Sequence, residues 1–238
     1  MKKLSLIRLI PNFVTFISLT LGLTSIKFAM DLKWELAVAM VVFASFLDNI
    51  DGKLARLLKS NSSFGVELDS LSDFVSFGIA PAVIVYLWTM SDGLSNSWAF
   101  VIFYSICSSS RLAKFNITSL DNSKENKIKY FQGISTPAAA GFVLLPMMIY
   151  FRFDVNFFLV PEFTAFTVIF AAILMITNIP TYSLKGLKLE KKVVPFFIIL
   201  FAGLISLLIS DFWLAMIIII SIYFLSIPVA IFEKKNSE

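Results

Sequence analysis

The chain has 238 residues and a formal net charge of +4; 58% of its residues are hydrophobic and 15% are charged. Soluble domains average about 45–50% apolar and about 25% charged residues, so this composition excludes an ordinary soluble domain and indicates an integral membrane protein. The sequence has no histidine and one cysteine, which excludes imidazole chemistry and an intramolecular disulfide. Acid–base chemistry therefore depends on carboxylates, and a bound metal is expected to be a hard, oxygen-preferring cation.

Eight apolar stretches are predicted to be membrane-spanning helices. A bilayer core of about 30 Å needs about 20 mostly apolar helical residues. The predicted spans are 12–30, 34–57, 66–90, 97–117, 134–151, 160–180, 194–210 and 212–232. Ser210 and Asp211 alone separate the last two, which predicts a tight helical hairpin. We therefore expect an all-α integral membrane protein with eight transmembrane helices, forming a single domain over residues 1–238.

The distribution of lysine and arginine predicts the orientation. With eight spans, all but three of the 20 cationic residues lie on the side of the two termini; the exceptions are Lys27, Lys33 and Arg152. The positive-inside rule then places both termini in the cytoplasm. We expect a multi-pass protein of the cell's inner (cytoplasmic) membrane.

Four aspartates are the most informative polar residues of this apolar chain. Asp48 and Asp51 are three residues apart, and Asp69 and Asp73 are four apart, so each pair lies on one helical face. An ionised carboxylate within a membrane costs about 2.5–3.5 kcal/mol on insertion scales, so positive charge must offset the cluster. Bound metal and Arg56 are the candidates. We expect one or two Mg²⁺ or Mn²⁺ ions in an active site at the cytoplasmic ends of the first four helices.

Three functions of this cluster are considered. Two metal ions could clamp a diphosphate, Arg56 could bind phosphate oxygens, and a carboxylate could take a proton from an attacking hydroxyl. Structural ion pairs do not balance, because four carboxylates would face one arginine. A cation transporter would place its carboxylates near the bilayer midplane, often in each of two repeats. This cluster is expected near one face and no second repeat is found, which favours metal-dependent chemistry.

The spacing D-x2-D-G-x2-A-R-x8-G-x3-D-x3-D between residues 48 and 73 resembles the signature of the CDP-alcohol phosphotransferase family. This family transfers a phosphatidyl-type group from a CDP-linked lipid to an alcohol and releases CMP. The resemblance implies four metal ligands, the last of which is also the general base: Asp48, Asp51, Asp69 and Asp73. It further implies a CDP site lined by signature residues, namely Gly52, Ala55, Arg56 and Gly65.

The segment Ile10–Thr15 is similar to the start of the family's first helix. The resemblance implies that Asn12 and Thr15 approach the nucleotide or its phosphates. The alternative is that Pro11 and Asn12 simply begin a helix.

Two further stretches resemble bacterial and archaeal phosphatidylserine synthases. Residues 108–116 are similar to an R-L-A-R-F-N stretch, with Lys114 where arginine is usual, and residues 131–141 to F-x-G-L-P-x-P-A-A-A-G, with Ser135 in place of proline. The resemblance implies a CDP-diacylglycerol–serine O-phosphatidyltransferase with CDP-diacylglycerol and L-serine as substrates and CMP as product. The serine carboxylate needs a fixed cation, and Arg111 is the candidate; a snorkelling arginine is the alternative. The other expected acceptor-site residues are Lys114, Asn116 and Gln132.

Other acceptors stay open within this class, namely glycerol-3-phosphate and inositol phosphate, as does an archaeal-type lipid donor. A phosphorylated acceptor should need at least two buried cations besides Arg56, and Arg111 and Lys114 alone qualify, which favours serine. The family is often dimeric, so a homodimer within the lipid bilayer is expected. No nucleic-acid partner is expected.

Overall fold

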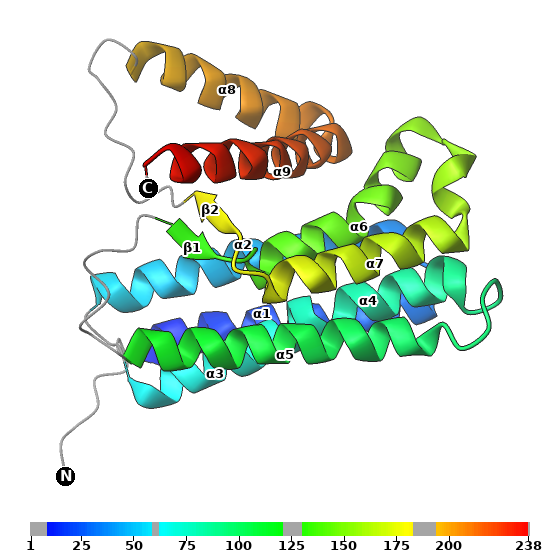
Figure 1. Cartoon of the computed structure of the whole chain (residues 1–238), viewed down its shortest axis with the longest axis horizontal. Coiled ribbons are helices and arrows are strands. Elements are labelled where there is room, and N and C mark those ends of the chain that lie inside the picture. The colour runs from blue at the N-terminus through cyan, green and yellow to red at the C-terminus, as the bar shows by residue number, and fades with distance from the viewer. Residues whose placement is uncertain (1–8, 59–61, 121–129, 183–193, 238) are drawn as a thin grey trace.

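The protein is a helical bundle with a separate C-terminal hairpin, seen in a computed structural model that describes residues 9–58, 62–120, 130–182 and 194–237 (Figure 1). In chain order the elements are α1 (Ile10–Met30), α2 (Trp34–Leu57), α3 (Ser63–Asp73), the π-helix η2 (Phe74–Ile79), α4 (Ala80–Val85), the π-helix η3 (Tyr86–Met90), α5 (Trp98–Leu120), β1 (Tyr130–Gln132), α6 (Thr136–Phe153), the 3₁₀-helix η4 (Asn156–Leu159), α7 (Pro161–Ile176), β2 (Pro180–Tyr182), α8 (Val194–Ser210) and α9 (Phe212–Ser237).

Each of the eight predicted stretches contains a helix, and α2 and α8 have the predicted bounds. The third is one continuous helical segment, Ser63–Met90. Within the described residues, four helical segments are long and apolar enough to cross a membrane: Ile10–Met30, Ser63–Met90, Thr136–Phe153 and Phe212–Phe232. These segments make the chain a multi-pass membrane protein.

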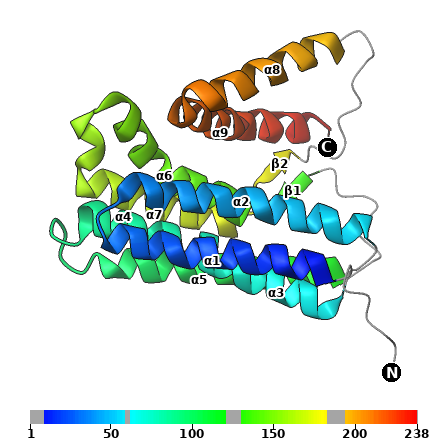
Figure 2. The same cartoon turned by 180° about the vertical axis from the view of Figure 1, so that it is seen from behind.

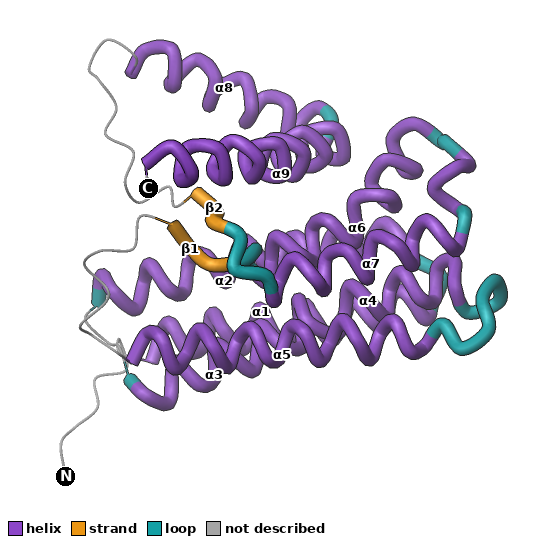
Figure 3. Tube along the Cα trace, in the orientation of Figure 1, coloured by secondary structure: helices purple, strands orange, loops and turns teal. Residues whose placement is uncertain are grey.

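The predicted end of the sixth span, 160–180, is wrong. The helix α7 ends at Ile176 because Thr177 is extended, and the chain then enters β2. Strands β1 and β2 pair antiparallel, with Phe131 opposite Thr181. Figure 3 shows this ribbon between the bundle and α9, which contacts β2. The fold is therefore helical except for one short ribbon among the described residues.

Small residues allow α1 to pack closely against its neighbours in the bundle. Its buried face is built from Pro11, Thr15, Ser18, Gly22, Ser25 and Ala29. Figure 2 shows α1 between α2 and α3, and α1 contacts both helices. Helix association in a membrane depends on close packing and interhelical hydrogen bonds rather than on the hydrophobic effect, and small residues permit that approach. The hydroxyl of Ser18 accordingly donates to the carbonyl of Ala44 in α2 at 3.0 Å.

The π-helix η2 begins directly after Asp73 and is supported by α5. Pro81 has no N–H with which to complete a regular α-helical bond to the Phe77 carbonyl. The buried Tyr104 hydroxyl donates to that carbonyl at 3.0 Å, and the Ser105 hydroxyl donates to the next one, Gly78, at 3.0 Å. A membrane protein must satisfy such backbone groups internally. The side chains of α5 thus stabilise the irregular segment that follows Asp73.

The C-terminal hairpin lies outside the main bundle. Helices α8 and α9 meet at Asp211, as predicted, and α9 contacts α6 and β2 (Figure 1). Helix α8 packs on α9 and exposes large apolar side chains, including Phe196 and Phe201. The hairpin therefore presents α9 to the bundle and α8 to the lipid.

Replacing Gly22 with alanine is expected to destabilise the bundle. An added Cβ would lie 2.7 Å from the Ser76 Cα, so backbone must shift. Overpacking of this kind costs about 1–3 kcal/mol, and thermal unfolding in detergent measures it. The matched control is Gly203→Ala in α8, where an added Cβ meets nothing within 4 Å. Equal unfolding temperatures for the two variants would contradict the close α1–η2 contact.

Candidate active site

The structure brings the four aspartates together, as the spacing predicted. Asp48 and Asp51 lie on α2, and Asp69 and Asp73 lie on α3, and both helices pack against α1. One carboxylate oxygen each from Asp48, Asp51 and Asp69 lies within 4.8 Å of the other two. The Asp48 side chain is also within hydrogen-bonding reach of Asp69 and Asp73. The two pairs therefore face one another and form one cluster.

Helix α1 holds one edge of this cluster. The Thr15 hydroxyl lies 2.7 Å from Asp51 Oδ2 and 3.1 Å from the Pro11 carbonyl. The shorter distance indicates that it donates its hydrogen bond to the Asp51 carboxylate. Ser72 of α3 donates to the Thr15 carbonyl at 3.3 Å. Thr15 was predicted to approach the nucleotide; here it orients Asp51, which is 4% exposed.

Asn12 of α1 lies next to Gly65, which is in the first turn of α3. The backbone N–H of Gly65 donates to the Ser62 hydroxyl at 3.0 Å, which caps the helix. A Cβ on Gly65 would lie 3.2 Å from both Asn12 Oδ1 and Ser62 Oγ. The signature glycine therefore keeps room for the cap and for Asn12.

Gly52 and Ala55 lie one helical turn after Asp48 and Asp51 on the same side of α2, and Arg56 follows them. An added Cβ on Gly52 would meet nothing within 4 Å, so no described residue fills the space beside it. The Arg56 Nε donates to the Gly52 carbonyl at 3.0 Å, and Arg56 is exposed. Ala55 is half-buried. This face has space for a ligand, with a guanidinium at its edge.

No described cation forms an ion pair with the aspartates. The ion pairs of the described chain join Lys27 to Asp31 and Arg152 to Asp211, and both lie at the opposite end of the bundle. Arg56 was one candidate counter-ion for the aspartates, but its Nε donates to the Gly52 carbonyl and it forms no ion pair with a described residue. Four clustered carboxylates without a paired cation are the arrangement that a bound metal ion resolves.

Arg111 lies beside Asp73, as an acceptor-binding cation requires. Its Nε donates to the Ile134 carbonyl, and it lies close enough to Asp73 for the two charges to interact. A snorkelling arginine would extend towards water, whereas this half-buried side chain is held inside the bundle by the turn before α6. This hydrogen bond favours a fixed Arg111 over a snorkelling one.

The other predicted acceptor residues surround this position less closely. Lys114 Nζ donates to Asn178 Oδ1 at 2.8 Å, and Asn116 Nδ2 donates to the Ser70 hydroxyl at 2.9 Å. Gln132 is in β1 opposite Pro180, and its side chain lies outside the described part of the structure. Lys114 and Asn116 thus link α5 to its neighbours in the structure.

Two residues near the cluster were missed from the sequence. Thr136 is fully buried, and its hydroxyl donates to Asp73 Oδ2 at 3.4 Å. Tyr223 of α9 lies close enough to Arg111 to interact with it electrostatically. The Ser-Thr-Pro sequence at 135–137 indicates a helix start, and Ser135 does cap α6. The contact of Thr136 with α3 depends on tertiary packing, which the sequence does not indicate. Nothing in the sequence of α9 distinguishes Tyr223.

The residues present fit a divalent metal ion. The cluster offers carboxylate oxygens alone, the ligands that Mg²⁺ and Mn²⁺ prefer. Asp73 Oδ1 is buried and has no hydrogen-bond partner among the described residues. A buried carboxylate oxygen without a donor is costly unless a cation or ligand binds it. The oxygen that no protein donor satisfies is thus available to a metal or to a substrate proton.

Comparison with known proteins identifies the class. A model of the CDP-alcohol phosphatidyltransferase family matches residues 8–181, and the chain belongs to this family, whose members in general depend on divalent metal ions. It is 30% identical over 230 residues to the CDP-diacylglycerol--serine O-phosphatidyltransferase of Mycobacterium leprae, covering 96% of this chain and 76% of that protein. It is 34% identical over 188 residues to the Helicobacter pylori protein of the same name, covering 77% and 76%. A third relative of that name, from Bacillus subtilis, is 34% identical over 130 residues, covering 55% and 70%.

Replacing Asp69 with asparagine is expected to remove the stabilisation by Mn²⁺. Bound metal at 100 times its Kd stabilises a folded protein by about 2.7 kcal/mol, which raises the unfolding temperature. The variant should lose this shift. In EDTA it should unfold at the same or a higher temperature than the wild type, because one repelling carboxylate is gone. Thermal unfolding with and without Mn²⁺ measures both effects.

The matched control for this measurement is Asp31→Asn. Asp31 is an aspartate in an exposed ion pair with Lys27, at the other end of the bundle. It should keep the full Mn²⁺ shift. An undiminished shift in Asp69→Asn would show that the ion binds elsewhere.

Proposed function

We propose that the protein is a phosphatidylserine synthase, which transfers the phosphatidyl group of CDP-diacylglycerol to the hydroxyl of L-serine and releases CMP. The observation that carries this proposal is the facing arrangement of the four signature aspartates with Arg111 beside Asp73. Relatives named for this reaction that align with most of the chain support it.

The aspartates would hold the metal and the base. Asp48, Asp51, Asp69 and Asp73 would bind one or two Mg²⁺ or Mn²⁺ ions, which supply charge neutralisation for the diphosphate and the departing phosphate. Thr15 keeps Asp51 turned towards its partners, and Arg56 lies at the edge of the open face of α2, where it can bind phosphate oxygens. Gly52 leaves room for the nucleotide beside Ala55, and Gly65 leaves room for Asn12, which would approach the nucleotide from α1.

Asp73 is the proposed general base. Its carboxylate accepts the proton of the serine hydroxyl as the serine oxygen attacks the lipid-bearing phosphorus. The bond from that phosphorus to the CMP oxygen breaks, and CMP leaves with the bonding electrons. Direct transfer without a phosphoenzyme follows, because each aspartate is needed as a ligand or base. A trapped covalent lipid–enzyme species would contradict this step.

Serine recognition is assigned to Arg111. Its guanidinium is fixed through Nε by the Ile134 carbonyl, which leaves the terminal nitrogens for a carboxylate. The proposal also assigns Lys114, Asn116 and Gln132 to the surroundings of Arg111. Lys114 and Asn116 would act by holding α5 against its neighbours. One half-buried arginine beside the base matches a small zwitterion better than a phosphorylated acceptor, which needs more positive charge.

The membrane placement follows from both ends of the bundle. Figure 1 shows the end of α2, the start of α3 and the end of α5 together at one end. All four tryptophans belong to the other end, at the starts of α2, α5 and α9 and near the end of η3: Trp34, Trp98, Trp213 and Trp88. Tryptophan is enriched at membrane interfaces, and cytoplasmic segments are rich in lysine and arginine. We therefore assign the aspartates and both termini to the cytoplasmic side of the inner membrane.

The same placement supports eight crossings within one domain over residues 1–238. The helices run between the two ends, and the shorter apolar helices α7 and α8 are connected in series with the longer ones. Assembly as a homodimer stays a prediction from the family resemblance. A cation transporter is disfavoured, because Asp51 is only about 9 Å along the axis from the end of α2 rather than at the middle of a span.

CMP release from CDP-diacylglycerol by the purified protein with Mn²⁺ tests the function directly. Serine, glycerol-3-phosphate and inositol phosphate are added in separate reactions. Serine-dependent release is expected, and Asp73→Asn should lower it by at least about a hundredfold, the usual contribution of a general base. Unchanged Mn²⁺-free unfolding would show that this variant is folded. Release with a phosphorylated acceptor alone would keep the family reaction and contradict serine recognition by Arg111.

Thr136 is expected to act as a positioning residue for Asp73. Thr136→Val keeps the shape of the side chain but removes its hydrogen bond, so kcat should fall about tenfold, the kinetic equivalent of one such bond. The KM for CDP-diacylglycerol should change little. Thr136→Ser keeps the hydroxyl and should retain near wild-type kcat. Equal losses in the two variants would indicate a packing role instead.

A further inference from the structure

An apolar cavity of about 510 Å³ lies between the bundle and the C-terminal hairpin. Its walls come from α2 and α6 on one side and from α9 and the end of α8 on the other. The volume is within the range of ligand pockets, about 300–1,000 Å³. A cavity of this kind within a membrane protein is suited to a hydrocarbon chain, because its lining is almost wholly apolar.

One end of this cavity lies near the aspartate cluster. Its lining includes Asn49, adjacent to Asp48, and Pro137, adjacent to the Thr136 that contacts Asp73. It also includes Phe77, one helical turn beyond Asp73. Residues on three separate elements thus connect the cavity with the site at which the lipid phosphate would react. A chain attached to that phosphate can enter the cavity without leaving the protein.

The other end of the cavity is lined by large side chains. Along α6 the lining extends from Pro137 to Met148, a rise of about 16 Å. Leu144 and Met148 face Phe212, which begins α9, and the Phe212 ring stacks on Phe43 of α2 at 6.2 Å. The cavity therefore has a definite length, and an aromatic pair lies at its end.

The hairpin that closes the cavity lies beyond the part of the chain that matches the family model. That match ends at residue 181, whereas α8 and α9 begin at Val194 and Phe212. Without them the apolar faces of α2 and α6 would be open to lipid. The catalytic aspartates are all within the matched region, so the hairpin is a wall added to the reaction core.

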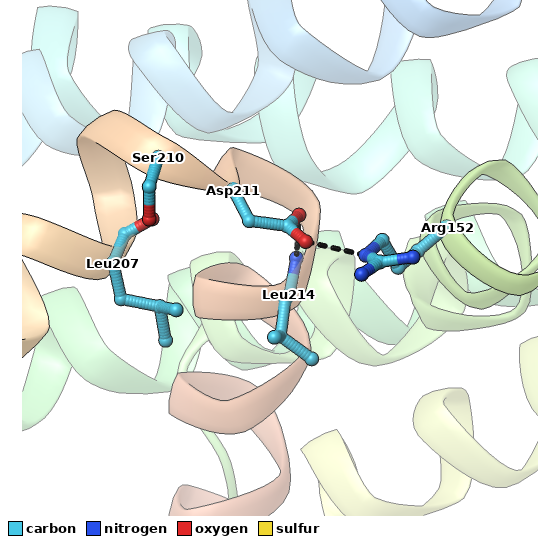
Figure 4. A network of polar contacts seen from close by, with 5 residues as sticks. All are labelled: Arg152, Leu207, Ser210, Asp211 and Leu214. Atoms are coloured by element: carbon cyan, nitrogen blue, oxygen red, sulfur yellow. Dashed lines mark hydrogen bonds and ion pairs between the residues drawn. The ribbon is translucent and has the colours of Figure 1, made fainter.

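Polar contacts at the far end hold this wall in place. Figure 4 shows the guanidinium of Arg152, in the last turn of α6, directed at Asp211 between α8 and α9. The other Asp211 oxygen accepts from the Leu214 backbone N–H at 3.1 Å. That N–H and then Arg152 hold the pKa of Asp211 below its usual range, so the ion pair persists through neutral pH. The Phe142 and Phe224 rings, 4.5 Å apart, join α6 to α9 deeper in the membrane.

We propose that the α8–α9 hairpin selects the lipid donor by chain length, enclosing one hydrocarbon chain in the cavity and stopping its end at Phe212, Leu144 and Met148. This inference rests on the proposed function, since it concerns the donor of that reaction. A chain that is too long meets the Phe212–Phe43 pair, and one that is too short leaves the cavity partly empty. Either mismatch weakens the binding of the donor.

The test is CMP release from dilauroyl, dipalmitoyl and distearoyl CDP-diacylglycerol, with kcat/KM measured for each. Phe212→Ala lengthens the cavity and should shift the preference towards distearoyl donor, by at least about tenfold in the ratio of kcat/KM values. Leu144→Phe shortens it and should shift the preference towards dilauroyl donor. Phe212→Leu should give a smaller shift in the first direction, and it keeps the test valid if the alanine variant does not purify.

The matched control is Phe201→Ala, the same substitution on the lipid-facing side of α8, where the side chain is 64% exposed. Its length profile should equal that of the wild type. Active Phe212 and Leu144 variants with unchanged profiles would overturn the selection by the hairpin. Absence of CMP release from every donor in the wild type would instead overturn the proposed function, so the two failures are distinguishable.

Discussion

The constraint on which the structure depends is the confinement of four carboxylates to one small space in an apolar chain. They repel one another, and no described cation forms an ion pair with them, although the charge of Arg111 acts on Asp73. The surrounding side chains act as neutral donors: Thr15 to Asp51 and Thr136 to Asp73. Neutral donors orient a carboxylate without cancelling its charge. The cluster therefore keeps its affinity for a metal ion, which a salt bridge would have weakened.

Close helix packing makes this confinement possible. Because lipid is as apolar as a leucine side chain, helices in a membrane are joined by small residues and interhelical hydrogen bonds. Gly22 lies against Ser76 and Gly78 against Ser108, on either side of the π-helix that follows Asp73. Tyr104 and Ser105 satisfy the carbonyls of that π-helix. The aspartate that serves as proposed base is thus attached to a segment fixed from two sides.

The parts of the molecule that could be predicted are those that depend on residues close together in the sequence. Apolar length predicted all eight helices, and spacings of three and four residues predicted which aspartates share a face. The approach of Thr136 to Asp73 and of Tyr223 to Arg111 depends on how distant helices pack, for which one sequence has no signal. The end of α7 was placed too late, although Asn178 and Pro180 are of the residue types that commonly follow a helix end. The pairing of β2 with β1, which one sequence does not reveal, fixes the extended backbone there.

The hairpin shows how a membrane enzyme can separate chemistry from lipid selection. Each of its helices satisfies its own backbone, so the hairpin can be added to the core without an unpaired edge. Since lipid provides no hydrophobic force that draws α9 to α6, specific contacts must hold it: the Arg152–Asp211 pair at the interface and the Phe142–Phe224 rings within the membrane. These contacts lie away from the aspartates. Side chains on the cavity wall can therefore change the volume offered to a hydrocarbon chain while the carboxylate cluster, held by α1, α3 and the start of α6, stays as it is.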